Sequence, residues 1–166
     1  PLVELGNTQT KCEGETVTLN AGTGGAIYQW FRDGTVLSSA VSPTLQVTQS
    51  GVYRVIVTGQ NQCIADDNVK IDFFASPVVN DLPQMINICQ GDSITLMATA
   101  SDYQTLQWFY ENNIISGSTG LTLKVKNSGK YSIEATNLAG CKTKKGTEVN
   151  VRSLPVVELG QDVTSC

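Results

Sequence analysis

The most constraining feature of this 166-residue sequence is a motif that returns at a fixed interval. Residues 12–19 read Cys-Glu-Gly-Glu-Thr-Val-Thr-Leu, and residues 89–96 read Cys-Gln-Gly-Asp-Ser-Ile-Thr-Leu. Cys12 and Cys89 are 89 − 12 = 77 residues apart, and Cys166 follows after 166 − 89 = 77 more. A fixed period of this length is typical of a tandem array. The sequence therefore predicts two small repeats and the start of a third.

Other positions repeat in the same way. Residues 155–166 match residues 1–12 at seven of twelve positions, an offset of twice 77. Further identical residues recur at an offset of 78: Trp30 with Trp108, Tyr53 with Tyr131, and Cys63 with Cys141. We expect the boundaries to be 1–75 for the first repeat, 76–153 for the second and 154–166 for the first strand of a truncated third. The chain is expected to be an excerpt from something longer.

The hydrophobic pattern predicts strands throughout. Apolar and polar residues alternate over 16–21, and 27–32 reads as the next strand, followed by the hairpin signal Asp33-Gly34. Two further strands are expected over 51–58 and 69–73, and Val3 with Leu5 suits a short first strand. No segment has a helical period, so we expect an all-β fold of about seven short strands per repeat, a β-sandwich. The linker is expected within 75–83.

The bulk composition excludes several classes of function. The chain has 40% hydrophobic and 16% charged residues and a net charge of −4, so a nucleic-acid partner is not expected. The apolar runs are too short to span a bilayer, and we expect no membrane insertion. A basic cluster, Lys142, Lys144 and Lys145, is explained by a solvated strand edge.

The sequence offers no machinery for catalysis. It has no histidine, no Gly-x-Ser-x-Gly, no phosphate-binding glycine loop and no convincing carboxylate pair, so we expect neither an enzyme nor a cofactor. Residues 66–68, Asp-Asp-Asn, and Asp33 carry oxygens that Ca²⁺ prefers, but no Ca²⁺-loop spacing is present. Turn chemistry accounts for such residues, and no metal site is predicted. Five cysteines without a histidine or Cys-x-x-Cys indicate disulfides and an oxidising compartment.

The order of a strand, Trp-Phe, a hairpin, Ser-Gly-x-Tyr-x-Val and a final alternating strand resembles the immunoglobulin fold. The usual core cysteines are absent: the matching positions are Ala21 and Val55 in the first repeat, and Ala98 and Ile133 in the second. The relocated cysteines resemble those of Ig-like and PKD-like repeats in large Bacteroidota cell-surface proteins. Gliding adhesins exported by the type IX secretion system are among these proteins. The resemblance implies an extracellular or cell-surface location and no shared active site.

In such a fold two disulfide patterns stay open, beside the alternative that the cysteines are free thiols. Cys12–Cys63 and Cys89–Cys141 would each close within one repeat, leaving Cys166 for the third. However, an Ig topology puts those partners at opposite ends of a sandwich, and a disulfide needs Cα atoms within about 7 Å. The other pattern is Cys12–Cys141, which joins the two repeats.

The resemblance also suggests roles for the large aromatic residues. Two tryptophans are expected in the core rather than as sugar platforms: Trp30 and Trp108. Two tyrosines are expected to be corner tyrosines of the fold: Tyr53 and Tyr131. The remaining ones are the residues to test first as ligand contacts: Tyr28, Tyr103 and Tyr110.

Three functions follow as hypotheses. The first is a structural spacer in the stalk of a large secreted or cell-surface bacterial adhesin, with neighbouring repeats as partners. The second is a module that binds a polysaccharide or protein through its loops. The third is an accessory domain of a secreted hydrolase.

Overall fold

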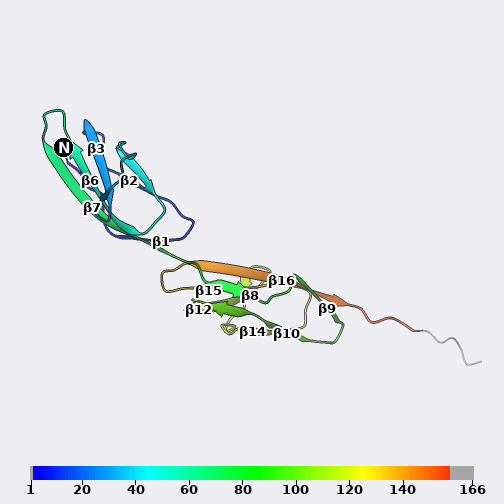
Figure 1. Cartoon of the computed structure of the whole chain (residues 1–166). Coiled ribbons are helices and arrows are strands. Elements are labelled where there is room, and N and C mark those ends of the chain that lie inside the picture. Colours follow the sequence, from blue (N-terminus) through cyan, green and yellow to red (C-terminus); the bar gives the residue numbers. More distant parts are fainter. Residues whose placement is uncertain (1, 158–166) are drawn as a thin grey trace, which may run out of the picture. The chain divides into compact units, whose positions relative to one another are not determined.

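The computed structural model describes residues 2–157, and these residues form sixteen β-strands and no helix. Figure 1 shows them in chain order. The chain divides into two compact units. Unit 1 comprises Pro1–Ser76 together with Asn137–Cys141, and unit 2 comprises Pro77–Thr136 and Lys142–Cys166. None of the described residues forms a helix that could cross a membrane.

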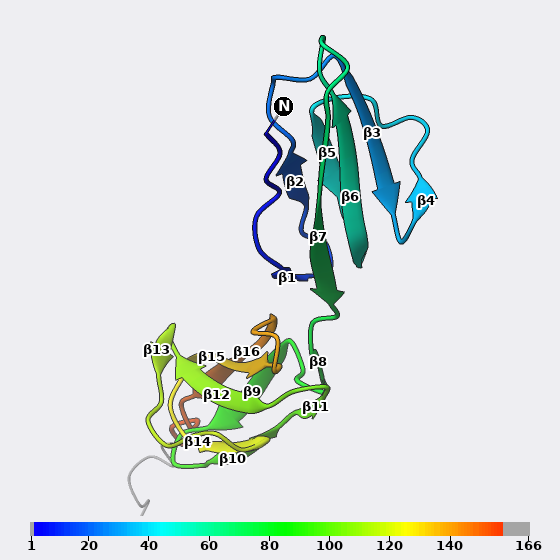
Figure 2. The ribbon, with the colours of Figure 1, turned by 90° about the vertical axis from the view of Figure 1, so that its left-hand side faces the viewer.

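Unit 1 is a sandwich of seven strands, seen in Figure 2. They are β1 (Gln9–Cys12), β2 (Val17–Asn20), β3 (Ile27–Arg32), β4 (Thr35–Val36), β5 (Thr44–Val47), β6 (Gly51–Thr58) and β7 (Ile64–Phe74). One sheet has the order β1-β7-β6-β3-β4, and the other pairs β2 with β5. β1 runs parallel to β7, whereas the other neighbours are antiparallel.

Unit 2 repeats this topology with two additional short strands. Its strands are β8 (Val78–Asn80), β9 (Met85–Cys89), β10 (Ile94–Met97), β11 (Thr99–Ser101), β12 (Thr105–Tyr110), β13 (Asn113–Ile114), β14 (Thr122–Val125), β15 (Gly129–Thr136) and β16 (Lys142–Arg152). The large sheet has the order β13-β12-β15-β16-β9, and β10 pairs with β14. β9 is parallel to β16, as β1 is to β7. A third pair joins β8 and β11.

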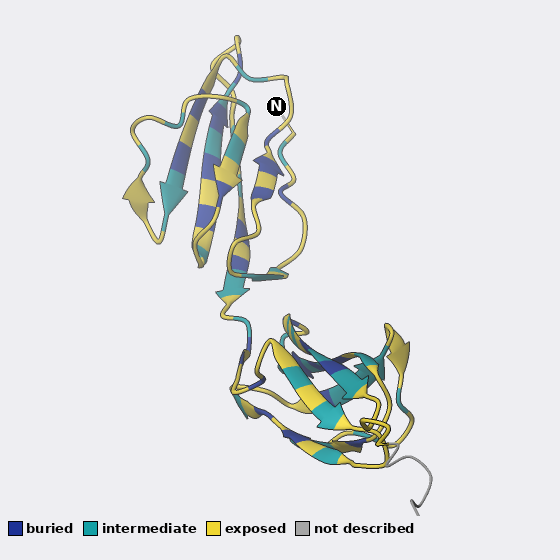
Figure 3. Cartoon of the chain, turned by 90° about the vertical axis from the view of Figure 1, so that its right-hand side faces the viewer, coloured by how far each residue is buried: buried dark blue, intermediate teal, exposed yellow. Residues whose placement is uncertain are grey.

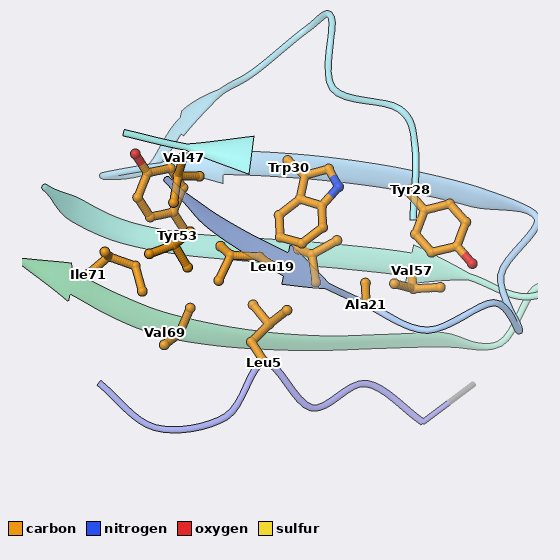
Figure 4. Close-up of a cluster of buried hydrophobic side chains, with 12 residues drawn as sticks. Leu5, Leu19, Ala21, Tyr28, Trp30, Val47, Tyr53, Val57, Val69 and Ile71 are labelled. Carbon is orange, nitrogen blue, oxygen red and sulfur yellow. The ribbon is translucent and has the colours of Figure 1, made fainter. Parts of the chain in front are cut away.

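Period-2 alternation places one side of each long strand in the core, as the bands of Figure 3 show. In unit 1, Trp30 and Val55 of the large sheet are fully buried and pack in one cluster with Leu19 of the small sheet. Ala21, which follows β2, belongs to the same cluster (Figure 4). The equivalent cluster of unit 2 is centred on residues that are likewise buried: Leu96, Ala98, Trp108, Ile133 and Val149. The positions of the usual immunoglobulin core cysteines, Ala21 and Val55 in unit 1 and Ala98 and Ile133 in unit 2, are thus part of the apolar core.

The strand predicted at Val3 and Leu5 is wrong. Residues 2–6 form no strand, and pairing begins only at Gln9. Leu5 is nevertheless buried, because its side chain packs in the unit 1 core, and its N–H donates to the Asp67 carboxylate at 2.7 Å. Gly6 follows with φ 83°, a left-handed conformation that interrupts an extended run.

The segment 75–83, where the linker was expected, contains an element of unit 2. β8 lies within it and pairs with β11, and both Val79 and Leu82 are buried in the unit 2 core. The β-branched pair Val78 and Val79 supplies this strand, and the linker is correspondingly shorter.

The Asp33-Gly34 signal does form the β3–β4 hairpin, with φ values of 49° and 80° that fit a type I′ turn. Glu111 and Asn112 adopt the same left-handed pair, at 46° and 67°, between β12 and β13.

The three lysines of the basic cluster lie on the first half of β16. β9 pairs only with Glu148–Arg152, so this half has a sheet partner, β15, on one side alone. Lys142 forms an ion pair with Glu134 at 2.9 Å, and the Lys144 ammonium lies 4.1 Å from the Phe109 ring centre. These contacts fit a solvated strand edge.

Candidate functional site

A disulfide joins Cys12 to Cys141 across 129 residues of sequence, with the Cα atoms 5.6 Å apart. Cys12 ends β1, and Cys141 ends the loop Asn137–Cys141 between β15 and β16, which we call the tip loop. The Cys141 side chain is 1% exposed. Of the two patterns left open by the sequence, the structure has the one that joins the repeats.

The position of Cys12 follows from the pairing of β1 with β7. The parallel register sets Cys12 opposite Phe74, the last residue of β7, and the next N–H, that of Glu13, donates to the Phe74 carbonyl at 2.8 Å. A turn follows, in which Gly14 has φ 90° and the Glu15 N–H donates back to the Cys12 carbonyl at 3.1 Å. The Cys-x-Gly motif is therefore the end of the edge strand and its turn.

The tip loop is held by Asn137. Its side-chain oxygen accepts the Cys141 N–H at 2.9 Å, and its side-chain N–H donates to the Ala75 carbonyl at 2.8 Å, just beyond β7. Gly140 has φ 84° and closes the turn by donating to the Asn137 carbonyl at 3.1 Å. One amide therefore both shapes the loop and fixes it beside the chain that follows Phe74.

The same register excludes the within-repeat pair Cys12–Cys63. Cys63 lies just before β7, whereas Cys12 lies opposite its last residue, Phe74. The 74 − 63 = 11 residues between these levels span about 35 Å in extended chain, far beyond the reach of a disulfide. Cys63 and Cys89 are exposed and form no disulfide within the described residues. Cys166 lies outside the described residues.

The structure places the tryptophans and corner tyrosines in equivalent settings. The indole N–H of Trp30 donates to the Ser42 carbonyl at 2.9 Å, and that of Trp108 donates to Gly120 at 2.8 Å. The hydroxyl of Tyr53 donates to the Gln49 carbonyl at 2.8 Å, and that of Tyr131 donates to Asn127 at 3.1 Å. These bonds to backbone four residues upstream are the tyrosine-corner geometry.

Burial raises the pKa of both corner tyrosines. For Tyr53 desolvation dominates, and the charge of Arg32 opposes it. For Tyr131 desolvation is again the largest cause, followed by Tyr110, whose ring centre lies 4.9 Å away. Both hydroxyls are therefore better suited to the neutral state in the folded protein.

The three tyrosines predicted for ligand contact lie in different settings. Tyr28 is 6% exposed, and its hydroxyl bonds to Gly22 and Gly25. It lines a hollow of about 290 Å³ with the exposed Ile27. Tyr110 lines another of about 340 Å³, and its hydroxyl donates to Ser128. Tyr103 is 38% exposed. Ligand contact stays a prediction, which burial disfavours for Tyr28.

The turn explanation for Asp66, Asp67 and Asn68 is wrong, because all three lie inside β7. Asp66 pairs with Arg54 at 2.8 Å, and Asp67 holds the N-terminal segment through Leu5. Asp33 does lie in a turn, where its carboxylate accepts the Val52 N–H at 2.8 Å. In the described part of the chain, no three His, Cys, Asp or Glu side chains gather as metal ligands would.

Sequence reasoning did not single out Asn137, and it used the two Ser-Gly pairs as fold markers without assigning a role to their serines. The Ser50 hydroxyl accepts the Phe73 N–H at 2.8 Å, and that of Ser128 accepts the Val151 N–H at 2.8 Å. Each serine therefore holds the end of the last strand, beside the Cys-x-Gly cysteine. The recurrence of Ser-Gly at an offset of 78 is the signal that points to them.

The comparisons with known proteins concern the fold. Residues 75–155 match the family described as "Ig-like domain CHU_C associated". Human hemicentin-1 is 24% identical over an alignment of 162 positions that covers 81% of this chain and 3% of that protein.

Among solved structures, the insect immune protein hemolin superposes with a TM-score of 0.51 at 18% identity, over 92% of this chain and 47% of that one. A chimeric titin Z1Z2 tandem gives a TM-score of 0.44 at 20% identity, over 88% and 95%. The chain is thus a tandem of immunoglobulin-like β-sandwiches, and its residues 75–155 match an Ig-like domain family.

Proposed function

We propose that this chain is a structural spacer: consecutive Ig-like repeats of a large secreted or surface-anchored bacterial adhesin that extend a distal binding region from the cell. Its immediate partners are neighbouring repeats of the same chain, and a surface polysaccharide or protein is the ligand of the distal region. Gliding adhesins are the type of protein to which the resemblance points. The repeats of this proposal are 1–75 and 76–153, with a third beginning at 154.

The observation that carries the proposal is the disulfide Cys12–Cys141. A bond that closed each sandwich would stabilise separate domains, whereas this bond ties the opening motif of one repeat to the tip loop of the next. Such a bond also requires an oxidising environment, which supports an extracellular or cell-surface location.

The covalent connectivity has a mechanical consequence. When the two chain ends are pulled apart, the load passes from Cys12 to Cys141 through the disulfide, and residues 13–140 lie outside the loaded covalent path. Most of both sandwiches is therefore removed from the tension-bearing chain. A spacer that must keep its length under load benefits from this connectivity.

Single-molecule force spectroscopy on the chain, held at its two ends, tests the proposal. Without reductant, we expect residues 13–140, between Cys12 and Cys141, to stay hidden; with reductant, unfolding should release roughly 450 Å more contour length. Equal contour lengths with and without reductant would contradict a load-bearing role for the disulfide. A variant with Cys63→Ala and Cys89→Ala is the control, and its oxidised form should behave like the parent.

A further inference from the structure

Cys89 occupies the same local structure in unit 2 as Cys12 does in unit 1. It ends β9, which runs parallel to β16 with Cys89 opposite Arg152, the last residue of that strand. The Gln90 N–H donates to the Arg152 carbonyl at 2.8 Å, and the Asp92 N–H donates back to the Cys89 carbonyl at 3.1 Å. Both distances equal those around Cys12, and Gly91 has φ 95° where Gly14 has 90°.

Cys63 likewise occupies the position of Cys141. In the β6–β7 loop the Gly59 N–H donates to the Cys63 carbonyl at 2.8 Å, and the Gln62 N–H donates to the Gly59 carbonyl at 3.0 Å. The tip loop has the same two bonds, at 3.0 and 3.1 Å, and Gln62 adopts the left-handed φ of 63° where Gly140 has 84°. Cys89 and Cys63 therefore have the backbone hydrogen bonds and turn conformation of the bonded cysteines Cys12 and Cys141, and both are exposed.

We propose that Cys89 and Cys63 each form a disulfide of the Cys12–Cys141 type with a different neighbouring repeat. Cys89 corresponds to Cys12 in this bond, and Cys63 corresponds to Cys141. The rule is that the Cys-x-Gly cysteine of one repeat bonds the loop cysteine of the repeat that follows it. Cys12–Cys141 is the instance that the structure contains. Cys89 then takes the loop cysteine of a following repeat, and Cys63 takes the Cys-x-Gly cysteine of a preceding one. This inference rests on the proposed function, and it adds the pairing rule and the reactive cysteines.

The bond forms by thiol–disulfide exchange with a small disulfide oxidant such as oxidised glutathione. The thiolate of one cysteine, having lost its proton to water, attacks the oxidant and releases one thiol. The thiolate of the second cysteine then attacks this mixed disulfide, forms the protein disulfide and releases the second thiol. Two protein thiols are oxidised, and one small disulfide is reduced to two thiols.

A series of such bonds would overlap. The bond at Cys12 encloses residues 13–140, and a bond at Cys89 would enclose the chain from residue 90 onward into the next repeat. The segment after Cys141, which the first disulfide leaves on the loaded path, would then lie inside the second. Every repeat would be enclosed by at least one disulfide loop.

A tandem duplication tests the rule. Because residues 155–166 repeat residues 1–12, joining Leu154 of one copy directly to Pro1 of a second copy keeps the sequence of a natural repeat junction. Cys166→Ser removes the cysteine at the end. In one version only Cys89 of the first copy and Cys63 of the second are kept, the other two exposed cysteines being serine. After oxidation by glutathione, thiol titration of the denatured protein should find no free thiol, and unreduced peptide mapping should find Cys89 bonded to Cys63.

The matched control keeps the opposite pair, Cys63 of the first copy and Cys89 of the second. It has the same composition, yet the rule predicts two cysteines that stay unpaired with each other. A disulfide within one chain in both versions, or in neither, would overturn the rule. Mapping Cys12–Cys141 in the same digests separates this result from the proposed function: if that bond is intact while Cys89–Cys63 fails, only the pairing rule falls.

A second measurement needs no fusion. The 166-residue protein carrying Cys166→Ser is oxidised at high concentration, and its disulfide-linked dimers are mapped. Three links between copies can form: Cys89–Cys63, Cys63–Cys63 and Cys89–Cys89. The Cys89–Cys63 link should be more abundant than random pairing of the two cysteines would give. A statistical mixture would contradict the rule even if the tandem duplication failed to fold.

Discussion

Asn137 is the residue on which the disulfide loop most depends, because its amide makes both the bond that shapes the loop and the bond that attaches it to Ala75. Changing Asn137→Ala leaves the Cys141 N–H and the Ala75 carbonyl without these partners, which should cost about 1–3 kcal/mol of unfolding free energy. Urea denaturation of the oxidised protein measures the loss. Leu138→Ala, at a neighbouring side chain that is 84% exposed, is the control and should change the midpoint little.

Because of the corner tyrosines, we expect the stability of the folded protein to fall at alkaline pH. Burial raises the pKa of Tyr53 and Tyr131 in the folded state above the value of about 10 in the unfolded chain. The neutral phenols therefore contribute stability that is fully present below pH 10 and is lost as the pH rises through the folded-state pKa. Melting temperatures should fall as the pH rises above about 10.

The doubly substituted protein, Tyr53→Phe with Tyr131→Phe, should be less stable at neutral pH, by about 1 kcal/mol for each lost hydrogen bond, and should show a weaker alkaline decline. Tyr103→Phe, at an exposed site, should keep the parent's pH dependence. An identical alkaline decline in the double variant would show that other groups cause it.

Among the elements, the hairpin β12–β13 and the start of β15 fit together only because Gly129 has no side chain. Its φ is 143°, and a Cβ there would lie 2.5 Å from Cε2 of Tyr110. Gly129→Ala should therefore lower the unfolding free energy by roughly 1–3 kcal/mol, measured by thermal or urea denaturation. Gly120→Ala places a methyl group in open space at an ordinary φ and should be nearly neutral. Equal effects of the two substitutions would contradict the steric account.

At the scale of elements, the sequence predicted strands where side chains alternate and hairpins where turn residues stand together. Trp30, Trp108 and the Asp33-Gly34 turn could be placed because each depends on local pattern. Leu5 could not, since its burial without a strand depends on packing against a core that distant strands assemble. Its N–H likewise bonds to the carboxylate of Asp67, 62 residues away, which only the fold brings there.

The cysteines show the same limit. Their spacing predicted a repeat, but the choice between the two disulfide patterns depends on the parallel register of β1 with β7, which no local pattern reveals. The role of Asn137 could not be predicted, because an isolated asparagine in a loop is ordinary. Its role depends on its hydrogen bonds to the Ala75 carbonyl and the Cys141 N–H, which only the structure reveals. The first strand of the third repeat, from 154 onward, falls mostly outside the described residues and stays a prediction.

For the whole molecule, the disulfide should supply a large part of the stability of the oxidised protein. Closing a loop of 129 residues lowers the entropy of the unfolded chain and is worth about 3–5 kcal/mol in the loop-entropy account. Changing Cys12→Ala together with Cys141→Ala should lower the unfolding free energy by this amount in urea denaturation. The pair Cys63→Ala with Cys89→Ala, at exposed and unbonded sites, should leave it nearly unchanged. A reversed order of these effects would contradict the assignment.

The central claim, that one repeat is bonded to the next, is tested most directly by tryptic peptide mapping without reductant. Cleavage after lysine and arginine places Cys12 on peptide 12–32, Cys141 on 131–142 and Cys63 on 55–70. The account predicts a linked species of peptides 12–32 and 131–142 that separates on reduction. A linked species of 12–32 and 55–70 would instead close the first repeat on itself and contradict the account.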